Sequence, residues 1–294
     1  MCTGRVTHEV SMDGYPRFTS ECSSLLKKHL SPDVYLACAG RVTPNGFTFD
    51  QVCQSGVDNQ DSGVGCYAGD EDSYTVFAPL FDKVIEDYHN GYKPTDTHVS
   101  DMDSSKLQGN ADPDGEYVLS TRIRVGRNIR GLGLSPGCSR AQRREVERIV
   151  TAALNNVEGD LKGKYFSLAN MTEADRKQLV ADHFLFKKGD RFLQSCGANR
   201  DWPEARGIFH NNEKNFLVWV NEEDQMRIIS MQKGADAKEV RACVCFGVLR
   251  EGKKGKANSL NHTILQTNKQ TSKQTNKHRC TRTSFPPRFC PAGV

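Results

Sequence analysis

The sequence predicts an α+β protein in which a small all-helical N-terminal domain precedes an antiparallel sheet flanked by helices. Residues 70–89 place apolar side chains at helical spacing, whereas residues 117–125 alternate strictly between apolar and polar positions. Helical patterns at 139–157 and 172–184 then interleave with the strand-like runs of a hairpin at 216–231. Helices that alternate with antiparallel strands are typical of an α+β domain.

The first hundred residues read as helices joined by polar turns. The stretch SPDVYLAC at 31–38 offers a Ser cap and a Pro at the first helical position, and therefore predicts a helix. Residues 70–89 begin with acids and are expected to form one amphipathic helix. The Gly- and Asp-rich segment 56–70 is expected to be a loop. The polar segment 94–115 suits a linker between domains. The apolar stripe of the amphipathic helix would comprise Val76, Phe77, Leu80, Phe81 and Ile85.

The alternation at 117–125 assigns each side chain to one face of a strand. One face would carry Leu119, Thr121, Ile123 and Val125, and the other Ser120, Arg122 and Arg124. Ser139 is a suitable cap for a helix over 139–157. FLVWVN and MRIISMQ flank an acidic turn as a hairpin, with Trp219 expected in the core.

Composition narrows the classes of function. Apolar runs are far shorter than the about 18–20 residues of a membrane span, and the N-terminus has no apolar signal segment. Eleven scattered cysteines then favour reduced thiols and a cytoplasmic location. Cys243 and Cys245 have no second pair at zinc spacing, so no metal site is expected. The basic segment 241–294 lacks interleaved aromatic residues, so nucleic acid is not an expected partner.

Three features could carry chemistry. Arg122 and Arg124 project from one strand face, which fits either a polyphosphate clamp or a solvated outer face. The acids at 222–224 could accept a proton, hold a metal or orient a cationic substrate, or they could form a polar hairpin turn. Arg227, just beyond them, favours a site for both a cation and an anion. His183 could contact a base or ribose, or end a helix.

Five collinear motifs resemble the phosphagen kinases, which are the ATP:guanidino phosphotransferases. They are STRIR at 120–124, DHFLF at 182–186, GDRFLQ at 189–194, RDWPEARGIFHN at 200–211 and FLVWVNEED at 216–224. The likeness extends from about Gly14 to about Val240. It implies an all-helical domain at 14–98 and a catalytic antiparallel-sheet domain at 112–240, in agreement with the element pattern.

The resemblance also implies an activity: reversible transfer of the γ-phosphoryl group of Mg-ATP to a guanidino nitrogen. Mg²⁺ would be held mainly through the nucleotide. Glu223 would grip the guanidinium and help to take its proton. Arginines would screen the phosphate charge during in-line transfer. By resemblance, the nucleotide-binding residues would be Ser120, Thr121, Arg122, Ile123, Arg124, His183 and Arg227.

The loop DSGVGCYA at 61–68 resembles that of arginine kinases, in which a short loop is followed by a tyrosine. Backbone N–H groups of a glycine-rich loop suit a carboxylate, and a tyrosine hydroxyl can bond an amino group. L-Arginine is therefore the expected acceptor. Asp61 and Arg191 would pair between the domains on closure. By this likeness the acceptor-binding residues would be Ser62, Gly63, Val64, Gly65, Tyr67 and Glu223.

Several alternatives stay open. The acceptor could be creatine or another guanidine. A hypothesis of another functional class is that the chain is a nonenzymatic fragment that binds nucleotide. A homodimer is also open. Because the likeness fades near residue 240, we expect an incomplete catalytic domain, impaired activity and a disordered low-complexity tail at 241–294. Cys280 and Cys290 lack the surroundings of the family's reactive cysteine.

Overall fold

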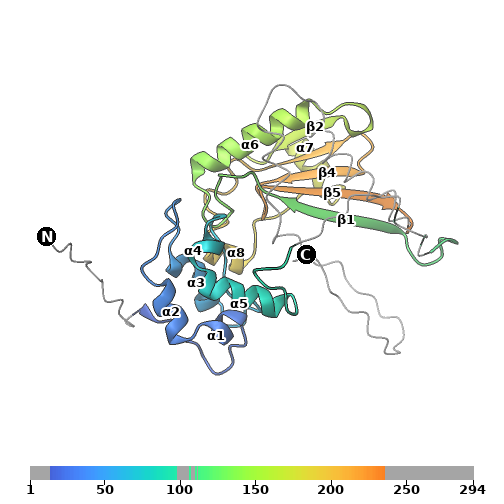
Figure 1. Ribbon diagram of the computed structural model, residues 1–294. Helices are drawn as coiled ribbons and strands as arrows, with labels where there is room; N and C mark the ends of the chain where they lie inside the picture. Colours follow the sequence, from blue (N-terminus) through green and yellow to red (C-terminus); the bar gives the residue numbers. More distant parts are fainter. Residues whose placement is uncertain (1–13, 98–105, 107–109, 111, 236–294) are drawn as a thin grey trace.

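The computed structural model describes residues 14–97, 106, 110 and 112–235, and these form a helical region and a sheet region (Figure 1). The expected tail at 241–294 and most of the expected linker at 94–115 lie outside the described residues. The domain limits 14–98 and 112–240 stay predictions. Within the described ranges, no helix has both the length and the apolar character needed to cross a membrane.

Side-chain caps fix where the first helices begin. Ser24 accepts a hydrogen bond from the amide of Lys27, and Thr48 forms a reciprocal capping box with Gln51. Ser31 caps the second helix as predicted, with Pro32 at its first position. The helical region comprises α1 (Leu25–His29), α2 (Pro32–Cys38), α3 (Phe49–Asp58), α4 (Ser73–Val76) and α5 (Ala78–Tyr88).

The prediction of a single helix over 70–89 is wrong, because the segment forms two helices, α4 and α5, that meet at Phe77. The backbone at Phe77 has φ −110° and ψ 28°, outside the helical range. Pro79 lies in the first turn of α5 and has no N–H to donate to the preceding turn, so a continuous helix cannot form. The predicted loop at 56–70 likewise begins late, since α3 continues to Asp58.

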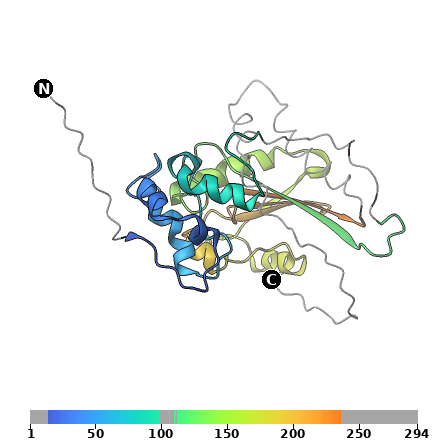
Figure 2. The same ribbon diagram turned by 60° about the horizontal axis from the view of Figure 1, so that its bottom comes forward.

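The sheet region contains five antiparallel strands in the order β1-β5-β4-β3-β2. Helices cover both faces: Val146 of α6 packs on the face that carries Val218, and Leu179 of α7 packs on the face that carries Leu217. Figure 2 shows the two helices on opposite sides of the sheet. The elements are β1 (Ser120–Arg127), α6 (Arg140–Asn155), the 3-10 helix η3 (Gly159–Leu161), β2 (Gly163–Ser167), α7 (Glu173–Ala181), α8 (Arg191–Ser195), β3 (Gly207–Asn211), β4 (Phe216–Val220) and β5 (Met226–Lys233).

The two regions touch through α3 and α8, which lie side by side (Figure 1). The Ser55 hydroxyl donates to the Phe192 carbonyl at 3.0 Å, and the Asn59 amide group donates to the Ser195 hydroxyl at 3.0 Å. A second link comes from the loop after β1, where the Leu134 amide donates to the Gly69 carbonyl at 2.9 Å. The helical region is therefore held directly against the sheet region.

Gly56 is the point where α3 packs against the predicted acceptor loop. A Cβ at position 56 would lie 2.2 Å from the Gly65 carbonyl oxygen. We expect Gly56→Ala to lower the free energy of unfolding by about 1–3 kcal/mol, because the backbone clash exceeds the gain in helix propensity of about 1 kcal/mol. Urea denaturation measures this change. Gly63→Ala is the matched control, since a Cβ there meets nothing within 4 Å; equal stability of the two variants would contradict the prediction.

Candidate active site

The acidic turn between β4 and β5 is anchored at both ends by buried amide side chains. Asn221 adopts a left-handed φ of 55°, and its side-chain N–H group donates to the carbonyls of Arg143 at 3.0 Å and Ala205 at 2.7 Å. Gln225 accepts from the Ile129 amide at 2.7 Å and donates to the Gly133 carbonyl at 2.8 Å. The Asn221 amide closes the turn on the Gln225 carbonyl at 3.0 Å. These bonds fix the three acids between them.

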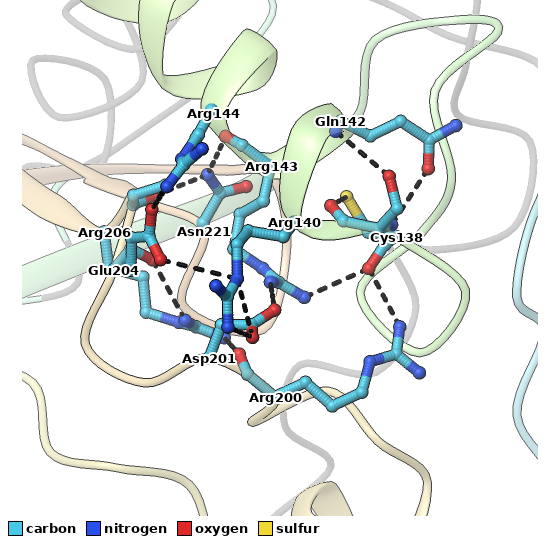
Figure 3. A network of polar contacts seen from close by, with 12 residues as sticks. Cys138, Arg140, Gln142, Arg143, Arg144, Arg200, Asp201, Glu204, Arg206 and Asn221 are labelled. Carbon is cyan, nitrogen blue, oxygen red and sulfur yellow. Dashed lines mark hydrogen bonds and ion pairs between the residues drawn. The ribbon is translucent and has the colours of Figure 1, made fainter.

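A network of arginines adjoins this turn at Asn221 (Figure 3). Arg143 of α6 is 3% exposed and pairs with Asp201 at 3.1 Å, while its backbone carbonyl holds Asn221. Arg140 pairs with the other Asp201 oxygen at 2.5 Å. Arg206 is fully buried and donates to the Ala198 carbonyl at 2.9 Å. The RDWPEARG segment therefore supports the acidic turn: the Asn221 side chain donates to the Ala205 carbonyl in this segment, and Asp201 of the segment pairs with Arg143.

The three acids of the turn all contact one guanidinium, that of Arg227. The distances from Arg227 nitrogens to carboxylate oxygens are 3.0 Å for Glu222, 2.6 Å for Glu223 and 3.2 Å for Asp224. The side chains of Glu222 and Asp224 are only 17% and 13% exposed, whereas that of Glu223 is 37% exposed. The turn is thus not a solvated polar hairpin, and Glu223 is its most accessible acid.

Burial and crowding set the protonation behaviour of this cluster. Burial raises the pKa of Asp224 to about 6, with Arg227 opposing the shift and Glu223 adding to it. Burial also raises the pKa of Glu222. Burial disfavours the charge on Arg227, yet Glu222 and Asp224 outweigh it and raise the pKa of that guanidinium. Three carboxylates contact the one guanidinium of Arg227, and Arg127 also acts on Asp224, so the partly exposed Glu223 is the acid that a cationic ligand could reach.

Position 126 of β1 must be glycine-sized for Asp224 to lie where it does. Gly126 pairs with Arg227 across the β1–β5 ladder. A Cβ at Gly126 would lie 2.5 Å from an Asp224 carboxylate oxygen. The carboxylate therefore rests directly on the strand backbone.

The predicted phosphate arginines share one face of the sheet. The β1–β5 register places Arg122, Arg124 and Arg227 on the same side. Burial and the positive charges of Arg124 and Arg227 lower the pKa of Arg122. Among the residues that the structure describes, no carboxylate pairs with Arg122 or Arg124. This arrangement favours the anion-binding interpretation over a face neutralised by scattered acids.

The other residues predicted to bind the nucleotide do not all lie on the arginine face. Ser120 lies at the start of β1 on the arginine face, whereas Thr121 and Ile123 alternate to the opposite face. The Thr121 hydroxyl donates to the Gly234 carbonyl at 2.7 Å. His183 is exposed just beyond α7 with a left-handed φ of 57°, as expected of a residue that ends a helix. Its role near a nucleoside stays a prediction.

The predicted acceptor loop lies against the first turn of α1. The carbonyls of Gly63 and Val64 accept the amides of Leu25 and Leu26, and Gly65 has a left-handed φ of 83°. Ser62 is buried. The loop is therefore tied by its carbonyl oxygens to a helix start.

Asp61 and Arg191 form an ion pair between the helical region and α8. The Asn59 side-chain oxygen accepts a further bond from Arg191 at 3.3 Å. Both charged side chains are more than half exposed, so the pair contributes little to stability. Its predicted part in closure stays a prediction.

One pocket lies between the helical region and the acidic turn. It brings together Val64 and Tyr67 of the predicted acceptor loop with Glu223 and Asp224 of the turn. Burial raises the pKa of the Tyr67 hydroxyl, and the negative charge of Glu223 adds to the shift. In the described ranges, no group of His, Cys, Asp and Glu side chains is arranged to hold a metal ion.

Sequence reasoning missed the residues that position this pocket. Asn221, Arg143 and Asp201 come from three separate segments, and no local pattern marks them as partners. The RDWPEARG motif was the one signal available, since two arginines beside acids in a short segment call for internal partners.

Comparisons with known proteins show what this chain is similar to. The family model for the N-terminal domain of ATP:guanido phosphotransferases matches residues 20–86, and that for the C-terminal catalytic domain matches residues 145–251. An arginine kinase of Anthopleura japonica is 53% identical over 229 residues, covering 78% of this chain and 32% of that protein. A creatine kinase B-type of Gallus gallus is 52% identical over 241 residues, covering 80% of this chain and 63% of that protein.

Two solved structures are also similar to this chain. The crystal structure of a lombricine kinase matches with a TM-score of 0.74 and 48% identity, covering 77% of this chain and 62% of that one. A duplicated taurocyamine kinase of Schistosoma mansoni matches with a TM-score of 0.74 and 39% identity, covering 82% of this chain and 35% of that one. The chain thus spans between about a third and two thirds of the length of these relatives.

Asn221 combines a left-handed backbone with two buried hydrogen bonds. We expect Asn221→Ala to lower the free energy of unfolding by about 2–4 kcal/mol, because two carbonyls lose a partner and alanine disfavours positive φ. Asn221→Gly should cost less, because glycine loses the same two hydrogen bonds but adopts a positive φ without strain. Asn90, exposed with φ 54°, is the control for strain without buried bonds. Chemical denaturation of the variants measures each cost; a loss at Asn221→Ala no larger than at Asn90→Ala would contradict the prediction.

Asp224 should make stability depend on pH. Its folded pKa of about 6 lies above the unfolded value of about 4, so the folded chain binds the proton more tightly and loses stability as pH rises from 4 to 6. We expect the stability of the wild type relative to Asp224→Asn to fall by up to about 2–3 kcal/mol across this range. Urea denaturation at several pH values measures it, with Asp114→Asn as the exposed control. A constant difference, or a rise, would contradict the prediction.

Proposed function

The chain belongs to the ATP:guanido phosphotransferase family, the phosphagen kinases, and on that basis we propose that it transfers the γ-phosphoryl group of Mg-ATP reversibly to L-arginine. The observation that supports this most directly is the pocket lined by both Tyr67 and Glu223, the most exposed acid of the turn. A planar guanidinium is a cation that a carboxylate can hold and orient.

Glu223 is proposed to bind the guanidinium and to take up a proton from the attacking nitrogen. It is the most exposed of the three acids, and its Oε2 atom already holds one guanidinium, that of Arg227, at 2.6 Å. Glu222 and Asp224 are more deeply buried and contact the other two nitrogens of Arg227, Nη1 and Nε. Their part is to position Arg227 and to maintain the negative potential of the site.

The nucleotide is proposed to lie with its phosphates on the arginine face. Arg122, Arg124 and Arg227 would neutralise the charge that otherwise repels an incoming nucleophile. Phosphate oxygens would compete with Glu223 for the guanidinium of Arg227. Nucleotide binding would thereby free the Glu223 carboxylate for the acceptor, so that each substrate favours the binding of the other.

L-Arginine is proposed as the acceptor on the basis of the loop. Tyr67 lies in the same pocket as Glu223, at the end of the glycine-bearing segment that would receive an amino-acid backbone. Identities of 53% to an arginine kinase and 52% to a creatine kinase do not choose between acceptors. Creatine, lombricine and taurocyamine are therefore the acceptors against which arginine has to be compared.

A coupled assay of ADP release with these four acceptors tests the proposal. We expect turnover with arginine above the other three, and a loss of at least about 100-fold in kcat for Glu223→Gln, because the amide can neither pair with the cation nor take a proton. Glu213→Gln, an exposed acid in the β3–β4 turn, is the matched control. Full turnover by Glu223→Gln would overturn the assigned role, and preference for another acceptor would overturn arginine.

A further inference from the structure

The pocket beside Glu223 has a second wall that the proposed reaction does not use. Its first wall consists of the acceptor loop and the acidic turn, represented by Val64, Tyr67 and Glu223. Its second wall is built from α4, α5 and the loop after β1. We call this wall the apolar annex and define it as Tyr74, Phe81, Val84, Ile85, Leu134 and Pro136.

The annex adjoins Glu223 through a single loop. Ser135 stands between Leu134 and Pro136, and its hydroxyl donates to the Glu223 carbonyl at 2.5 Å. The Leu134 amide donates a hydrogen bond to the Gly69 carbonyl, and the Leu134 side chain packs against the core of the helical region. The loop that supports the turn therefore also brings apolar side chains to the same pocket.

The chemistry of the annex is aromatic and uncharged. The rings of Tyr74 and Phe81 lie 5.2 Å apart at an angle of 55°, and Phe81 and Val84 are 5% and 4% exposed. Burial raises the pKa of Tyr74 to about 12, so its hydroxyl stays neutral. A third ring can pack edge-on against such a pair. No annex residue carries a charge, and the negative charge of the pocket lies at Glu223 and Asp224.

This division indicates what would fill both parts. The charged amino and carboxylate groups of arginine are poorly suited to the annex and belong with the loop at 62–67. A ligand that places a cation at Glu223 and an apolar group in the annex satisfies both walls. The partly exposed Glu223 carboxylate favours the cation, and apolar side chains favour a ring.

We propose that the pocket binds guanidines or amidines that carry an aryl or branched alkyl group, in competition with the acceptor substrate. The cationic head pairs with Glu223, and the apolar group packs among Tyr74, Phe81 and Leu134. The inference rests on the proposed role of Glu223 as the partner of a guanidinium. It adds a subsite and a ligand class to that role.

Isothermal titration of the full chain with three compounds tests the ligand class. Phenethylguanidine offers both groups, methylguanidine offers the cation alone, and phenethylurea is the neutral isostere. We expect phenethylguanidine to bind at least tenfold more tightly than either of the others, because burial of the ring and pairing of the cation each add to affinity. Arginine should displace it. Equal affinity for phenethylguanidine and methylguanidine would overturn the annex.

Two substitutions test the location. Ile85→Ala and Leu134→Ala should each weaken phenethylguanidine at least fivefold, and weaken methylguanidine less than twofold. Val76→Ala is the matched control, because Val76 is half-buried and packs on the same core but does not line the pocket. Thermal unfolding confirms that each variant is folded. Retention of full phenethylguanidine affinity by both Ile85→Ala and Leu134→Ala would overturn the location.

The outcomes separate this inference from the proposed function. If arginine is phosphorylated but the phenyl group adds no affinity, the annex is wrong and the proposed function stands. If Glu223→Gln binds both guanidines as well as the wild type does, the role of Glu223 fails, and the inference fails with it.

Discussion

One guanidinium shared by three carboxylates is the constraint on which the rest of this structure depends. Glu222, Glu223 and Asp224 all reach Arg227, and their mutual repulsion would open an unsupported turn. Asn221 and Gln225 prevent this because each is buried and each bonds to backbone outside the hairpin. The turn therefore keeps a concentration of negative charge that an isolated hairpin would disperse into solvent. Under the proposed function, that charge favours a cationic ligand in the pocket.

The buried arginines behind the turn show what this support requires. Arg206 is fully buried, burial lowers its pKa to about 10, and within the described residues its Nε atom has no hydrogen-bond partner. Stacking on Trp202 and bonds to the Ala198 and Arg200 carbonyls compensate in part. Buried charge of this kind is expensive, so its presence needs a reason beyond packing. The network holds α6, the 200–206 segment and the acidic turn in one arrangement, which gives the site a fixed base (Figure 3).

Arg227 connects the two halves of the proposed reaction. Its guanidinium contacts the acidic turn, and its strand position places it on the face that carries Arg122 and Arg124. Under the proposed function, the same side chain would exchange a carboxylate for phosphate oxygens when nucleotide arrives. The pocket on the other side of Glu223 is built partly from the helical region, so the acceptor would lie between the two regions while the nucleotide lies on the sheet. Hydrogen bonds from Ser55 and Asn59 to α8 hold the helical region against the sheet region.

The sequence by itself determined the local features. Capping residues predicted where helices start at Ser31 and Ser139, and strict alternation predicted the arginine face of β1, because both depend on backbone geometry over a few residues. Pro79 also carried the information for the break at Phe77, although helical spacing concealed it. Tertiary structure alone decided that the acidic turn is half-buried and that Asn221 and Arg143, 78 residues apart, hold it. It also brought Leu134 to the helical core to form the annex. Burial and long-range pairing depend on which distant segments meet, and no local pattern records that.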